Sequence, residues 1–177
     1  INAIKKAKDE YFASLVEFQK SDQFPMRPER ILFDLREALP ADGYVVADVG
    51  WNKNGVGQQF PIYEAGTFVA PGGLCTMGYG PSAALGVKVA RPDKKVVALI
   101  GDAALSGGMA FEALNHIGQV QTSMVVILND NEFSISRNVG AMVKHLGYMR
   151  ATTQYREARD SVQERLESSG PLGTALA

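Results

Sequence analysis

The fold of this 177-residue chain is decided by two stretches, Val96-Val97-Ala98-Leu99-Ile100-Gly101-Asp102 and Met124-Val125-Val126-Ile127-Leu128-Asn129-Asp130-Asn131. Each is a short apolar run that ends in small or polar residues. Strands that are covered on both faces of a sheet have this nearly continuous apolar composition. The pattern therefore predicts two buried strands, over residues 96–100 and 124–128.

The sequence around these strands alternates between strand and helix patterns. A third apolar run covers residues 44–49 and a weaker one covers 67–70, while helices are predicted at 82–90 and 108–117. A βαβα alternation indicates a parallel sheet with helices on both faces. We therefore predict a Rossmann-like α/β fold. Such sheets usually have more than four strands, so we expect an incomplete domain.

Helical patterns dominate both ends of the chain. Residues 4–18 predict an amphipathic helix, and a second helix is expected from Pro28 to just before Pro40. A charged helix is predicted over 153–168, where Gly170-Pro171 closes it. The predicted organisation is an N-terminal helix and linker at 1–26, an α/β domain at 27–150 and a C-terminal helical segment at 151–177.

Composition excludes several functional classes. A net charge of −1 and a pI near 6.2 provide no basic face for nucleic acid. Cys75 is the single cysteine and cannot form an internal disulfide, and no apolar run approaches the roughly 18 residues of a membrane span. We expect a soluble cytoplasmic protein. Because it begins with Ile1 and has no signal-peptide pattern, we also expect it to be part of a longer chain.

The polar residues that follow the two deciding strands predict a metal and phosphate site. In open parallel sheets, ligands bind beyond the carboxyl ends of the strands. Asp102 and Asn131 follow neighbouring strands, and oxygen ligands of this kind suit Mg²⁺. Gly101, Ala103 and Ala104 are small enough for backbone N–H groups at a helix start to approach a diphosphate.

Gly101-Asp102-Ala103, followed at this spacing by Asn129-Asp130-Asn131, resembles the cofactor motif of thiamine-diphosphate enzymes. The resemblance implies that Asp102, Asn131 and the backbone carbonyl of Phe133 bind Mg²⁺, and that 27–150 is a diphosphate-binding domain. Ala103 stands where the family usually has glycine, a change that ordinary backbone angles would tolerate.

The resemblance divides between two branches of these enzymes. Residues 27–102, which include Val46-Ala47-Asp48-Val49-Gly50 and the segment 71–80, resemble acetohydroxyacid-synthase-like enzymes. In that branch the methionine that matches Met77 supports the bent cofactor, and Gly72-Gly73 would close over the diphosphate. Residues 101–177, which include 107–116, 127–136 and 138–141, resemble 1-deoxy-D-xylulose-5-phosphate synthase. We expect a seam near Gly101, in a natural or engineered hybrid.

The resemblance implies a transferase that decarboxylates pyruvate and passes the two-carbon unit to a carbonyl acceptor. Such enzymes bind thiamine diphosphate between two domains and take an activating glutamate from the other one. This chain is therefore expected to supply half of a site. The other half would come from a dimer or other homo-oligomer, or from a separate pyrimidine-binding domain. No catalytic residue is assigned within the chain.

Two alternatives stay open at this point. Gly78-Tyr79-Gly80-Pro81-Ser82-Ala83 fits a loose dinucleotide fingerprint, and Asp102 lies 24 residues after Gly78, where an acid that binds the ribose of NAD would be found. The fingerprint leaves Asn129-Asp130-Asn131 without a role. The other alternative is a folded module that has no activity when isolated.

Overall fold

The structure is a computed structural model that describes residues 1–131, 139–153, 157 and 161. It divides into two compact units, Ile1–Asn129 and Asp130–Ala177, and each is described by itself. The first unit contains the predicted sheet. The second contains helix α7 (Ala141–Ala151).

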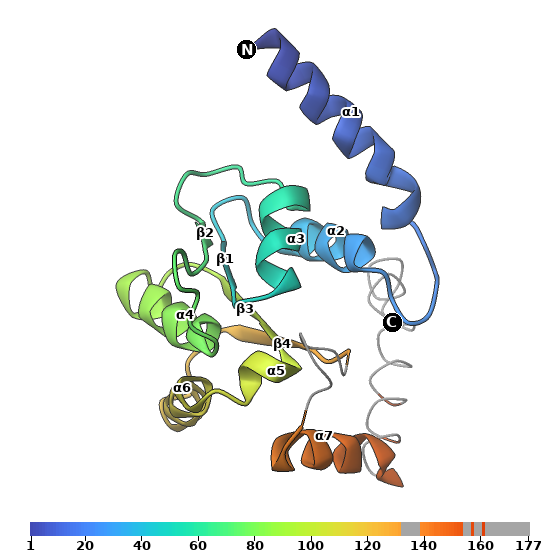
Figure 1. Cartoon of the computed structure of the whole chain (residues 1–177). Coiled ribbons are helices and arrows are strands. Elements are labelled where there is room, and N and C mark those ends of the chain that lie inside the picture. Colours follow the sequence, from blue (N-terminus) through green and yellow to red (C-terminus); the bar gives the residue numbers. More distant parts are fainter. Residues whose placement is uncertain (132–138, 154–156, 158–160, 162–177) are drawn as a thin grey trace. The chain divides into compact units, whose positions relative to one another are not determined.

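The sheet has four parallel strands in the part of the chain described here. They are β1 (Tyr44–Ala47), β2 (Phe68–Val69), β3 (Val96–Gly101) and β4 (Val125–Asn129), in the spatial order β2-β1-β3-β4. The register pairs Val45 with Phe68, and β3 joins β1 to β4 at the centre of the sheet. The predicted Rossmann-like parallel sheet is confirmed (Figure 1).

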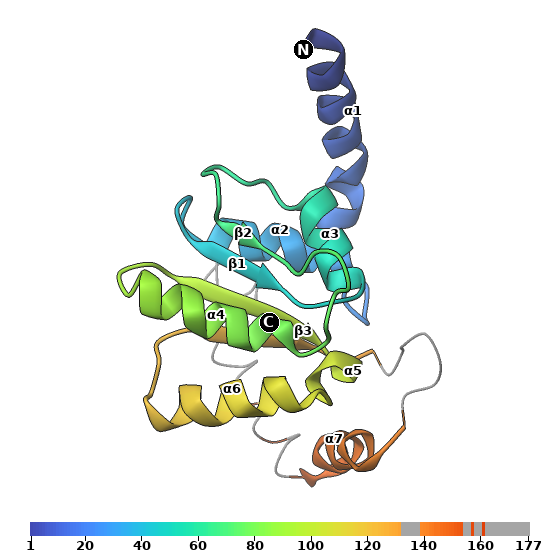
Figure 2. The same ribbon diagram turned by 60° about the vertical axis from the view of Figure 1, so that its left-hand side comes forward.

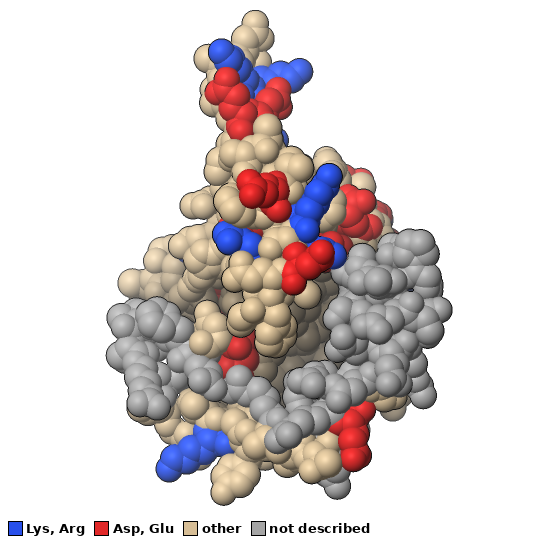
Figure 3. Space-filling view, turned by 90° about the vertical axis from the view of Figure 1, so that its right-hand side faces the viewer, with Lys and Arg blue, Asp and Glu red and all other residues tan. Residues whose placement is uncertain are grey.

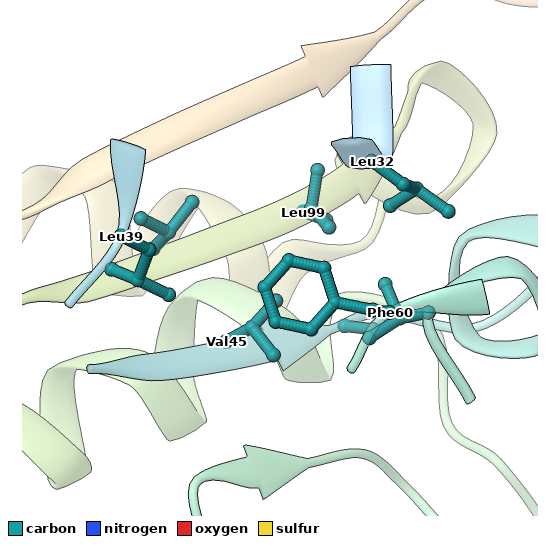
Figure 4. Packing of buried hydrophobic residues seen from close by; sticks show 8 residues of the cluster. Leu32, Leu39, Val45, Phe60 and Leu99 are labelled. Atoms are coloured by element: carbon teal, nitrogen blue, oxygen red, sulfur yellow. The ribbon is translucent and has the colours of Figure 1, made fainter. Parts of the chain in front are cut away.

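Side chains of alternate residues in the strands pack against helices on opposite faces of the sheet. On one face, Val45, Ala47, Val97 and Leu99 form a core with residues that come from or follow α2 (Pro28–Ala38) and α3 (Trp51–Gln59). Figure 4 shows how Leu32, Leu39 and Phe60 surround Val45 and Leu99.

The opposite face of the sheet is covered by α4 (Tyr79–Ala90). Val46, Val96 and Ala98 form a second core there with Ala84, which is fully buried. Helix α6 (Gly108–Gln119) lies alongside α4, as Figure 2 shows. The prediction of helices on both faces is confirmed.

Helix α1 (Asn2–Gln19) extends away from the sheet and contacts α2 (Figure 1). Leu15 is its one buried residue, so most of the helix faces solvent. Basic and acidic side chains are interspersed over it in Figure 3, and neither charge dominates the part of α1 that faces the viewer there. Residues 20–27 connect it to α2, which has Pro28 at its first position, as predicted.

Several elements differ from the prediction. Helices α3 and α7 were not predicted, and α4 begins at Tyr79 rather than at residue 82. Strand β1 ends at Ala47, two residues before the end of the predicted run, and the side chain of the next residue, Asp48, bonds to backbone N–H groups at the start of α4. Most of the helix predicted over 153–168 lies outside the described residues. The boundaries at 26/27 and 150/151 stay predictions.

Candidate functional site

The carboxyl ends of the strands lie along one edge of the sheet, which we call the carboxyl edge. β1 ends at Ala47, which pairs with Leu99, and β3 ends at Gly101, which pairs with Asn129 at the end of β4. Because the strands are parallel, the residues that follow them leave the sheet on the same side. The structure therefore brings Asp102 and Asn129 to one edge, whereas the residue predicted to bind the metal with Asp102 is Asn131, two residues further along the chain.

Asp102 is buried directly after β3. It opens α5 (Asp102–Leu105), a helix of four residues, and only 6% of it is exposed. Gly101 precedes it with extended backbone angles. Ala103 and Ala104 follow in helical conformation, so alanine is tolerated at the position where the resembling enzymes usually have glycine. The N–H groups of a first helical turn have no acceptor within their own helix.

The segment after Asp102 touches the glycine-rich segment that precedes α4. The Gly107 N–H donates to the Ala104 carbonyl at 3.0 Å, which closes a tight connection between α5 and α6. A Cβ atom on Gly107 would lie 3.1 Å from the Met77 carbonyl oxygen, and one on Gly78 would lie 3.2 Å from the Ala110 nitrogen. Glycine thus permits the two backbones to approach closely.

The turn at Gly72-Gly73, which is predicted to close over the diphosphate, is exposed. The Cys75 N–H donates to the Gly72 carbonyl at 3.3 Å, and Gly73 has a left-handed φ of +61°. Apart from the adjacent residues, no atom of the described part of the chain lies within 4 Å of a Cβ built on either Gly72 or Gly73. Met77 is 45% exposed, so it does not fill the core, as methionine often does in proteins. The roles of Gly72, Gly73 and Met77 toward a cofactor stay predictions.

Asp48 is a residue of the carboxyl edge that was not assigned from the sequence. It follows β1 and is completely buried. Its Oδ1 accepts the N–H groups of Val49 at 2.7 Å and of Gly78 at 3.2 Å, and its Oδ2 accepts that of Gly80 at 2.6 Å. The carboxylate therefore caps the start of α4. The available signal was an acid that interrupts the apolar run of residues 44–49, and the structure places this acid directly after β1.

This cap removes the support for the dinucleotide alternative. A Rossmann fingerprint binds pyrophosphate through backbone N–H groups at the helix start. Here the N–H groups of Gly78 and Gly80 already donate to a buried carboxylate, which would also repel a phosphate. The NAD-binding interpretation of Gly78-Tyr79-Gly80 is therefore not favoured.

Two more side chains from the start of α3 reach the carboxyl edge, and neither was assigned from the sequence. The Asn52 Oδ1 accepts a hydrogen bond from the Asn129 Nδ2 at 3.2 Å, which joins α3 to the end of β4. The Lys53 Nζ donates to the Pro71 carbonyl at 3.1 Å and lies 3.1 Å from the Cys75 Sγ. α3 itself was not predicted, so these residues had no assigned position.

The predicted metal ligands are divided among different parts of the chain. Asp102 belongs to the first unit and Asn131 to the second, while Phe133 lies outside the described residues. Within the described ranges there is no group of three or more His, Cys, Asp and Glu that could hold a metal ion. The predicted ligands are one carboxylate and two neutral oxygens, from an asparagine side chain and a backbone carbonyl, so the absence of such a cluster from the described residues does not test them. Its assignment stays a prediction.

Comparison with known proteins identifies relatives of the C-terminal half. The family model for 1-deoxy-D-xylulose-5-phosphate synthase matches residues 76–176. The 1-deoxy-D-xylulose-5-phosphate synthase of Brevibacillus brevis is 52% identical over 100 residues, which cover 54% of this chain and 16% of that enzyme. The enzyme of Desulforudis audaxviator is 50% identical over 96 residues, covering 52% of this chain and 15% of the relative.

The chain thus corresponds to a small part of these relatives. The matched range begins at residue 76, so it also includes residues 76–100, which lie before the seam expected near Gly101. The resemblance of residues 27–75 to acetohydroxyacid-synthase-like enzymes, and with it the hybrid interpretation, stays a prediction. Among the described residues, no helix is both long and apolar enough to cross a membrane.

Proposed function

Because this chain belongs to the 1-deoxy-D-xylulose-5-phosphate synthase family, we propose that its carboxyl edge binds the diphosphate of thiamine diphosphate together with Mg²⁺. The observation that carries the proposal is the position of Asp102, buried at the end of β3 beside the end of β4. Anionic ligands of open parallel sheets bind at this edge. The module would serve a transferase, in which bound thiamine diphosphate supplies the carbanion chemistry.

Each predicted residue has a separate role in this proposal. The Asp102 carboxylate, the Asn131 side chain and the Phe133 carbonyl would hold Mg²⁺, which prefers oxygen ligands. The N–H groups of Ala103 and Ala104 would donate to the diphosphate. Ala103 is half-buried and Ala104 is buried, so of the two Ala103 is the more accessible donor.

The segment before α4 would complete the diphosphate site. Gly101 would leave room beside the phosphates, Gly72-Gly73 would close over them, and Met77 would support the bent cofactor. The close approach of the Met77 carbonyl to Gly107 supports this arrangement, because the backbone of Met77 lies beside the residues that follow α5.

We propose pyruvate as the donor substrate and a small carbonyl compound as the acceptor, in the cytoplasm. The activating glutamate would come from a second domain. That domain would belong either to another copy of the chain, in a dimer, or to a separate pyrimidine-binding protein. Turnover therefore requires the partner, whereas binding of the diphosphate and Mg²⁺ does not.

Isothermal titration calorimetry of the 177-residue chain tests the binding proposal. We expect heat on adding thiamine diphosphate with Mg²⁺, and loss of that heat in Asp102→Ala. Asp42→Ala is the matched control, because Asp42 precedes β1 at the opposite end of the sheet and pairs with Lys94. Equal heats for wild type and Asp102→Ala reject the assignment. Heat with NAD and none with thiamine diphosphate would restore the dinucleotide alternative.

A further inference from the structure

Residues 48–53, which follow β1 and include the first turn of α3, bond to both ends of the glycine-rich segment between β2 and α4. Figure 2 shows the chain from β2 to α4 passing beside this connection. Asp48 bonds to the end near α4, and Lys53 bonds to the end near β2. None of the contacting residues is assigned a role in the proposed cofactor site.

The hydrogen bonds of Asp48 to Gly78 and Gly80, which we call the Asp48 clamp, are buried and use both carboxylate oxygens. Oδ1 accepts the Gly78 N–H at 3.2 Å and Oδ2 accepts the Gly80 N–H at 2.6 Å. Gly78 has a backbone φ of +86°, which residues other than glycine rarely adopt. A Cβ on Gly80 would lie 3.0 Å from Oδ2. Hydrogen bonds to a charged, buried acceptor are among the stronger ones in a protein, so this end of the segment has one defined position.

The Lys53 clamp is half-buried and acts on the other end. Its ammonium donates to the carbonyl of Pro71, which is itself buried, at 3.1 Å. The same nitrogen lies 3.1 Å from the Sγ of Cys75. One cation therefore connects α3 to two points that flank Gly72-Gly73.

Residues 72–77, between the two clamps, have little packing of their own. None of the six is buried, and Leu74 is 101% exposed. A segment without buried apolar side chains does not gain its position from the hydrophobic core. Its position therefore depends on its two ends, and at Met77 the backbone also lies close to Gly107.

We propose that Asp48 and Lys53 are positioning residues that together fix residues 72–77 beside the α5–α6 connection. The hydrogen bonds of Asp48 and Lys53 are present in the chain without any bound cofactor. Its effect on cofactor affinity rests on the proposed function, because Gly72, Gly73 and Met77 would contact the diphosphate only if thiamine diphosphate binds at the carboxyl edge.

Hydrogen exchange of the full chain, followed by NMR, tests the clamp without a ligand. We expect Asp48→Asn to raise the exchange rate of at least one of the Gly78 and Gly80 amides at least tenfold, because the asparagine side chain has one acceptor oxygen where aspartate has two. Lys53→Met should raise exchange at Cys75, and both variants should shift the methyl resonance of Met77 in protein labelled at methionine.

The matched controls remove similar interactions at the opposite end of the sheet. Asp42→Asn breaks an ion pair with Lys94 just before β1, and Lys88→Met breaks donation to the carbonyls of Pro92 and Lys94. Neither control should change exchange in 72–80. Wild-type exchange and an unshifted Met77 methyl in both clamp variants would overturn the proposal, and so would equal changes in the controls. Lys53→Met keeps the test valid if Asp48→Asn does not fold.

A titration with thiamine diphosphate and Mg²⁺, followed by the fluorescence of Trp51, measures the functional consequence. Trp51 is the single tryptophan and lies at the start of α3. We expect the Kd to rise at least fivefold in Asp48→Asn and Lys53→Met, and Lys53→Arg to restore most of the affinity. If wild type does not bind, the proposed function fails while hydrogen exchange still decides the clamp. Equal Kd values for wild type and both variants would refute the effect on the cofactor.

Discussion

Replacing Gly80 by alanine tests whether the Asp48 cap determines the start of α4. A Cβ at this position would lie 3.0 Å from the Asp48 Oδ2 and 3.1 Å from its Cβ. Both distances are too short for a buried carboxylate that already bonds to the Gly80 N–H at 2.6 Å. Overpacking of this kind costs about 1–3 kcal/mol, and a weakened hydrogen bond to a charged group adds to that cost.

Gly86→Ala in the same helix provides the comparison. Gly86 is exposed, and no atom lies within 4 Å of its Cβ position. Alanine in a helix is favoured over glycine by about 1 kcal/mol, so Gly86→Ala should raise the free energy of unfolding by up to that amount. Gly80→Ala receives at most the same benefit and should lower the free energy of unfolding by about 1–2 kcal/mol.

The assay is urea unfolding followed by Trp51 fluorescence, which reports on the first unit. The two variants should differ by about 1–3 kcal/mol in the free energy of unfolding, with opposite signs relative to wild type. Equal stabilisation by both would show that the Asp48 carboxylate has room to move, and the reasoning about the cap would be wrong.

Three further perturbations have defined outcomes. A hydrogen bond from Lys94 lowers the pKa of Asp42 in the folded protein. The ion pair therefore stabilises the fold above the unfolded-state pKa of 3.8, and this stabilisation is lost as the pH falls through the lower folded-state pKa. Acid unfolding curves should accordingly be steeper for wild type than for Asp42→Asn. Asn52→Ala leaves the Asn129 amide without its partner at the carboxyl edge and should cost about 1–3 kcal/mol in urea unfolding, whereas no change would mean that the bond is dispensable. Ile100→Ala removes a fully buried side chain of β3 and should cost about 2–5 kcal/mol by the same assay, and a smaller loss would indicate that the core collapses around the cavity.

The strands were predictable because burial on both faces gives a sequence signal that does not depend on tertiary detail. The runs around Val97 and Val126 gave the right strands within one or two residues. Helix α3 gave no such signal. It contains Gly55 and Gly57, which disfavour helix, and it is held by the burial of Val56 in the core between α3 and the sheet. Tertiary contacts of this kind cannot be derived from local propensity.

The site was predictable to the extent that strand ends carry it. Asp102 and Asn129 follow directly from the two deciding strands, and their common edge follows from parallel pairing. Asp48 has the same relation to β1 but was not assigned. Its role depends on Gly78 and Gly80, which lie 30 and 32 residues further along the chain. The partner of a buried carboxylate becomes visible only when the fold brings distant backbone N–H groups to it.

The Asp48 carboxylate that caps α4 affects the binding of a diphosphate at the carboxyl edge. Asp48 and Asp102 place two buried carboxylates there, and Lys53 is the nearby cation named in the described contacts. Its ammonium already donates to the Pro71 carbonyl. A diphosphate bound there would bring its negative charge close to these two carboxylates, and repulsion between like charges is strong where water is excluded. A divalent cation reverses that balance, because it attracts the phosphate oxygens and the Asp102 carboxylate at once. Binding of thiamine diphosphate should accordingly vanish in EDTA and return with Mg²⁺, and metal-independent binding would mean that the diphosphate is held elsewhere.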